Sequence, residues 1–65
     1  MMHADFHVQN EGSIFLLQPL TREAHDWADK YLPEDAQRFG SSIVIEHRYI
    51  LSIVEGIKAD GLEVR

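Results

Sequence analysis

Two runs of apolar residues recur with the period of an α-helix, and they constrain the fold more than any other feature of the chain. The first run lies between Thr21 and Pro33, two residues that typically bound a helix. A helix with a single apolar stripe must cover that stripe with another element, so the two runs predict a layered domain. The residues of the two stripes are Ala24, Trp27, Ala28, Tyr31 and Leu32, and then Ile50, Ile53, Val54 and Ile57.

The ends of both helices follow from side-chain chemistry. Thr21 is a good N-cap, because its hydroxyl can accept a hydrogen bond from an amide of the first turn. Pro33 disfavours helical backbone at the residue before it, so the first helix should end there. The second helix should run from about His47 to Asp60, since Gly61 stands where a C-terminal cap belongs.

Three other segments have the pattern of strands. Residues 6–9 alternate between apolar and polar side chains, and residues 41–45 end in a β-branched run. Residues 13–18 form the third segment, within which positions 14–17 are apolar on both faces. Such a run fits a central strand, or a strand with a second contact on its outer face.

The fold class predicted from this order is α+β. The elements follow each other as β-β-α-β-α, and residues 62–64 could add a short C-terminal strand. Residues 33–40 form a connection, and Phe39, its only large apolar residue, is expected to anchor it to the core. We expect a single domain over residues 1–65, with both helices on one face of a small sheet and with residues 1–5 disordered. These patterns do not determine the order of the strands within the sheet.

The chain has 65 residues and no cysteine, which limits how it can be stabilised. A domain of this size buries only about 60% of the surface that its unfolded chain exposes. Disulfides, thiolate zinc sites and cysteine nucleophiles are excluded. Good packing and self-association remain as sources of stability, and open sheet edges would favour pairing with another chain. We therefore expect a homodimer or a protein partner.

The formal net charge is −5, from 11 acidic and 6 basic residues. Binding to a phosphate backbone needs clustered Lys and Arg, so this balance disfavours direct contact with nucleic acid. No run approaches the ~20 apolar residues of a membrane span, and the first residues lack the pattern of a signal peptide. We expect a cytoplasmic protein with no membrane partner.

Sequence motifs assign no catalytic residue, no metal ligand and no cofactor. His25 and Asp29 can touch on the first helix, but two ligands do not make a zinc site. No phosphate-binding loop, dinucleotide fingerprint or nucleophile elbow is present. Trp27 and Tyr31 share a helix face, which indicates core packing or, alternatively, an aromatic anchor for a partner.

Two polar clusters are candidate interaction residues. An acidic series runs along the first helix into the connection, where it forms a solvated face or docks on a basic partner. A mixed cluster at the junction of strand and second helix either caps the helix and pairs locally, or works as an acid-base or ligand site. The members are Asp26, Asp29, Glu34 and Asp35 in the first cluster, and Glu46, His47, Arg48 and Tyr49 in the second.

Several stretches together resemble a group of short bacterial proteins, found in proteobacterial genomes and open to a phage or plasmid association. The resemblance covers nearly the whole chain after residue 10 and implies a natural, self-contained domain. It carries no activity, cofactor or site residue. The matching residues are 12–21, Trp27, 32–40, 45–50 and 59–62.

Three functions are compatible with these features. The first is a small acidic, non-enzymatic protein–protein interaction module, homodimeric because of its size. The second is an acidic decoy or inhibitor of a nucleic-acid enzyme, encoded by a mobile element, for which the first-helix carboxylates should form one continuous patch. The third is a small ligand binder or enzyme, which requires Glu46, His47 and Tyr49 to converge on a concave site.

Overall fold

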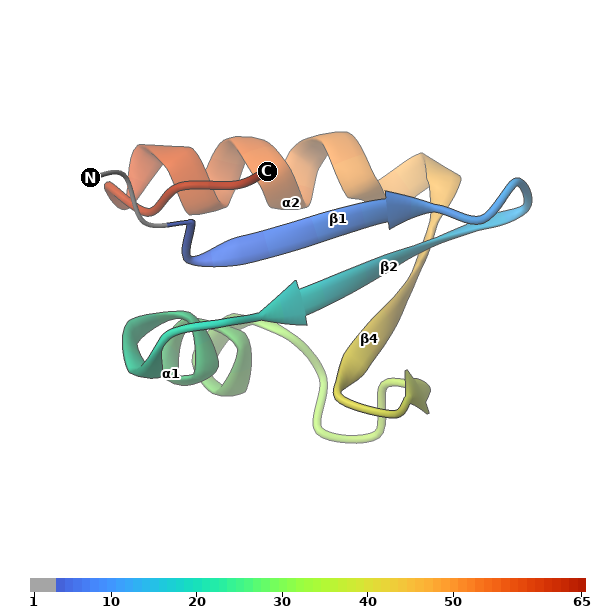
Figure 1. Cartoon of the computed structure of the whole chain (residues 1–65), viewed down its shortest axis with the longest axis horizontal. Coiled ribbons are helices and arrows are strands. Elements are labelled where there is room, and N and C mark those ends of the chain that lie inside the picture. The colour runs from blue at the N-terminus through green and yellow to red at the C-terminus, as the bar shows by residue number, and fades with distance from the viewer. Residues whose placement is uncertain (1–3) are drawn as a thin grey trace.

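The computed structural model describes residues 4–65, which form one four-stranded antiparallel sheet and two helices (Figure 1). The strands lie side by side in the order β1-β2-β4-β3, so β2 is central as its two apolar faces predict. The chain order β-β-α-β-β-α confirms the α+β class. The elements are β1 (Phe6–Asn10), β2 (Ile14–Pro19), α1 (Arg22–Tyr31), β3 (Arg38–Phe39), β4 (Ser42–Glu46) and α2 (His47–Ala59).

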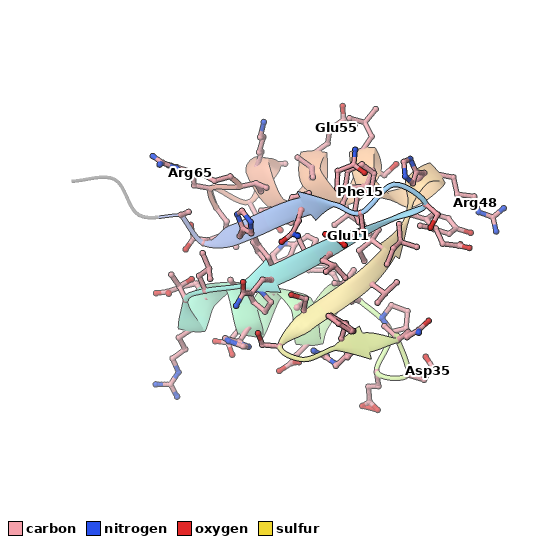
Figure 2. The ribbon with its side chains drawn as sticks, turned by 45° about the vertical axis from the view of Figure 1, so that its right-hand side comes forward. Glu11, Phe15, Asp35, Arg48, Glu55 and Arg65 are labelled. Carbon is pink, nitrogen blue, oxygen red and sulfur yellow. The ribbon has the colours of Figure 1, made fainter. Side chains whose placement is uncertain are left out.

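Both helices cover the same face of the sheet, as the sequence predicts. In Figure 2 the strands pass in front of α1 and α2. Side chains alternate between the two faces of a strand, so every second strand residue faces the helices. These inward residues and the helix stripes share one buried cluster. Its members are Phe6, Leu17, Ala24, Ala28, Ile43, Ile45 and Ile57.

The helix boundaries agree with the predicted ones. Thr21 Oγ1 accepts a hydrogen bond from the Ala24 amide at 3.1 Å, which confirms Thr21 as the N-cap of α1. Leu32 is the C-cap residue of α1. Asp60 ends α2, and Gly61 follows it with φ of 82°, a conformation that glycine adopts without strain. Within residues 4–65, no helix is long and apolar enough to cross a membrane.

The connection before β4 differs from its prediction. It contains a two-residue strand, β3, that forms a hairpin with β4 through Gly40, whose φ is 62°. Phe39 pairs with Ser42, and it therefore lies on the face away from the helices. It is 71% exposed, so the prediction that it anchors the connection to the core is wrong.

The C-terminal segment covers the outer edge of β1. Phe6 forms a parallel bridge with Val64, and the Phe6 amide donates to the carbonyl of Glu63 at 3.0 Å. The Val8 amide donates to the carbonyl of Arg65. The expectation of open sheet edges is therefore wrong at β1. At the other edge β3 is very short, which leaves few backbone groups for pairing.

Asp5 joins three distant parts of the chain. Its Oδ1 accepts from Thr21 Oγ1 at 2.7 Å, and its Oδ2 accepts from the Glu63 amide at 2.9 Å. The carboxylate thus links the start of β1 to the α1 cap and to the C-terminal segment. The predicted disorder of residues 1–5 is wrong at Asp5, and residues 1–3 lie outside the described part of the chain.

Candidate functional site

A groove lies between the two helices. Its larger hollow has a volume of about 480 Å³ and lies between the end of α1, the connection after it, β4 and the first half of α2. A second hollow of about 410 Å³ continues it along α2 and shares Tyr31, Leu32, Ser52 and Ile53 with the first. The floor reaches the buried side chains of Ile43 and Ile45.

The groove exists because the apolar stripes of the helices do not meet along their whole length. Tyr31 and Tyr49 stand at its rim and are 53% and 50% exposed. Each ring has a cation from the adjacent residue above it: the Lys30 ammonium 5.3 Å from the Tyr31 centroid, and the Arg48 guanidinium 5.0 Å from the Tyr49 centroid. These aromatic rims leave an apolar channel open to solvent.

Trp27 closes the groove toward the C-terminal end of α2. Its indole packs edge-on against Phe6, with 5.9 Å between ring centroids, and lies close to Gly56 of α2. Its Nε1 donates a hydrogen bond to Asp60 Oδ2 at 2.7 Å. Trp27 therefore links the two helices. It packs on the core, as one interpretation of its sequence position predicts, and it also lines the groove.

Carboxylates gather around Trp27 where the groove ends. A third hollow at this point is lined by Glu23, Asp26 and Asp60, with Lys30 as its one basic residue. The C-terminus of α2 adds the partial negative charge of its last carbonyl groups at the same place. We call this end of the groove, defined by Glu23, Asp26 and Asp60, the acidic mouth.

The four acidic residues predicted as one cluster are divided in space. Asp26 belongs to the acidic mouth, whereas Asp29 and Glu34 line a separate hollow together with Arg38. Asp35 is exposed in the connection after α1 and points away from the protein body (Figure 2). The structure thus brings Asp29 and Glu34 together, and it places Asp26 in a different hollow.

The junction cluster also separates. Glu46 and Tyr49 line the groove, and Arg48 makes an exposed ion pair with Glu46 at 3.5 Å. His47 points to the opposite side, where its Nε2 donates to the carbonyl oxygen of Gly12 and its ring lies 4.6 Å from the ring of Phe15. His47 thereby fastens the β1–β2 turn to α2, and it does not join Glu46 and Tyr49 in the groove.

The outer face of the sheet is the second surface of interest, because it carries almost no charge. Registers place Gln9, Leu16 and Val44 in one row across β1, β2 and β4. Neighbouring rows add His7 and Gln18, then Ile14 and Glu46, while Phe39 extends the face over β3. Glu46 is the only acidic residue among these outward positions, and none of them is Lys or Arg.

Among residues 4–65, no three His, Asp or Glu side chains are grouped closely enough to hold a metal ion. Of the described residues that line the larger hollow, Tyr31, Tyr49 and Ser52 carry hydroxyl groups, Glu46 carries a carboxylate, and none is a histidine. Sequence reasoning missed the groove, although Tyr31 and Tyr49 at the margins of the two stripes were a signal for it.

Comparisons with protein-family models, with curated proteins and with solved structures find no match to this chain. The resemblance to short bacterial proteins therefore stays a prediction.

Proposed function

We propose that this protein is a small, acidic, non-enzymatic interaction module that forms a homodimer through the outer face of its sheet. The observation that carries the proposal is the uncharged row of Gln9, Leu16 and Val44, on a chain whose net charge is −5. Two copies of an acidic protein repel each other wherever their carboxylates meet. An uncharged, partly apolar face is where a second copy can dock with the least repulsion.

Symmetry and exposure support the same partner. A dimer with two-fold symmetry brings one surface onto itself, so neither copy needs a complementary charge pattern. Phe39 is 71% exposed on this face, and Leu16 and Val44 are cross-strand neighbours at its centre. Edge-to-edge pairing has less support, because the C-terminal segment covers β1 and β3 is two residues long.

The test is sedimentation equilibrium over a concentration series, with Leu16→Lys as the disruptive variant. Removing one buried Leu contact costs about 1.5 kcal/mol. A symmetric interface contains this contact twice, so the dissociation constant of the dimer should rise ~100-fold. Leu51→Lys is the matched control, because Leu51 is 68% exposed on α2, away from the sheet face. Circular dichroism of both variants checks that the fold persists.

A wild-type chain that stays monomeric at millimolar concentration contradicts the homodimer. So does a dimer that Leu16→Lys and Leu51→Lys weaken equally, since that result would place the interface elsewhere.

A further inference from the structure

We propose that the interhelical groove binds an amphipathic helix of a partner protein, with the partner's basic residues at the acidic mouth. The groove is lined mainly by the two helices and the strand residues beneath them, and it borders the proposed dimer face at Val44 and Glu46. The proposal rests on the groove alone and does not depend on self-association.

The shape of the groove fits a helix. The channel follows α2 from Tyr49 to Asp60, which corresponds to about 17 Å at 1.5 Å per residue, or three helical turns. It is open to solvent along its length, whereas a site for a small molecule buries most of its ligand. An amphipathic helix buries only one apolar stripe and leaves its other faces in water, which is what a channel between two helices can accommodate.

The lining of the groove selects for apolar side chains along its length. Tyr31, Leu32 and Ile53 line both hollows, and the floor is formed by buried isoleucines. Glu46 at one end and Asp60 at the other are the only charged residues that line these two hollows. No Lys or Arg does so.

Charge determines the kind of partner. At the acidic mouth Glu23, Asp26 and Asp60 outnumber Lys30, and the C-terminus of α2 adds to the negative potential. An acidic helix would meet repulsion there, while a helix with Lys or Arg at the corresponding end would gain attraction. The observations therefore point to a basic amphipathic helix, as distinct from an acidic one, a second copy of this acidic chain or a neutral lipid.

The experiment uses two synthetic 16-residue helical peptides without aromatic residues. Both carry the same stripe of leucines, and one has Lys on its polar faces where the other has Glu. The chain has one tryptophan, and Trp27 lines the groove, so its fluorescence emission reports binding directly. We expect a saturable emission change with the Lys peptide and at least tenfold weaker binding of the Glu peptide.

Two pairs of variants separate groove binding from general attraction between opposite charges. Asp26→Asn with Asp60→Asn removes two charges at the mouth, and the new amide oxygen at position 60 can still accept from Trp27. Glu34→Gln with Asp35→Asn removes two charges outside the groove. The first pair should weaken binding of the Lys peptide about tenfold, and the second less than twofold. Equal losses in both pairs would overturn the proposal.

Ser52→Arg tests the location, because Ser52 is exposed and lines both hollows. Leu51→Arg adds the same charge one residue away, outside the groove. We expect Ser52→Arg to abolish the emission change and Leu51→Arg to leave it within twofold of wild type. Binding that survives Ser52→Arg, or peptides that do not bind at millimolar concentration, would contradict the inference whatever the oligomeric state of the protein.

Discussion

Replacing Asp5 by Ala should destabilise this domain more than any other substitution of an acidic residue in its described part. The carboxylate accepts from Thr21 Oγ1 and from the Glu63 amide, at 2.7 and 2.9 Å. A hydrogen bond to a charged group contributes about 1.5–3 kcal/mol, and Asp5 is only partly buried, so we expect a total loss of ~2–3 kcal/mol. Asp5→Asn should lose about 1 kcal/mol, because its oxygen can face Glu63 while its NH₂ group donates to Thr21.

The assay is urea and thermal unfolding followed by circular dichroism. A domain of 65 residues has a free energy of unfolding of roughly 3–10 kcal/mol, so the loss in Asp5→Ala is a large share of the total. It should lower Tm by about 10–20 °C. Asp35→Ala, an exposed substitution in the α1–β3 connection, is the control and should change the free energy by less than 0.5 kcal/mol.

A double-mutant cycle isolates the contact with the helix cap. Thr21→Ala removes both the hydroxyl that donates to Asp5 and the oxygen that accepts from the Ala24 amide at the α1 N-cap. The coupling energy between Asp5→Ala and Thr21→Ala should be about 1 kcal/mol. If Asp5→Ala and Asp35→Ala lose the same small amount, the reasoning is refuted, and the start of the chain would be as disordered as its sequence predicts.

Two further substitutions test how the structure uses its exposed and its mid-helix residues. Gly56→Ala should raise the free energy of unfolding by ~0.5–1 kcal/mol, because alanine favours the helix. The added Cβ would lie 3.5 Å from Trp27 Cζ2, which is an ordinary contact. A Tm below that of the wild type would show that the indole needs the space. Phe39→Ser should change the free energy of unfolding of the monomer by less than ~0.5 kcal/mol, since the ring is 71% exposed. Urea unfolding at low protein concentration measures this change. A loss above about 2 kcal/mol would mean that Phe39 packs on the core.

The candidate surfaces could be predicted only in part. Trp27 and Tyr31 were recognised as a shared helix face, and both line the groove. The acidic and junction clusters were predicted from adjacency in the chain, yet the structure divides both. Residues three apart are neighbours on a helix surface, yet Asp26 lines a hollow with Asp60, whereas Asp29 lines another with Glu34 and Arg38. Which distant residues lie beside each carboxylate is decided by the tertiary structure.

His47 shows why adjacency misleads at a junction. Glu46 is extended and His47 begins a helix, so their side chains leave the backbone in different directions. His47 meets Gly12 and Phe15, which are more than 30 positions earlier in the chain. Only the pairing of β2 with β4 brings that turn beside the start of α2.

The sequence was enough to predict both helices, the Thr21 cap of α1, the ends of both helices, the three longer strands and the layered α+β arrangement, whereas the predicted side-chain cap of α2 is absent at Glu46. These features depend on local physics: the period of the apolar residues, the hydroxyl of Thr21, and the backbone limits set by Pro33 and by Gly61. Each acts within a few residues, so a single chain read in order is enough to find them.

Features that join residues far apart in the chain could not be predicted from local patterns. Asp5 and Glu63 are 58 positions apart, and β3 acquires its strand conformation only by pairing with β4. The outward position of Phe39 follows from its register with Ser42, since a shift of one residue would turn it toward the helices. The groove arises in the same way, because the spacing of the two helices is set by the sheet beneath them and by the Trp27 indole that reaches Asp60.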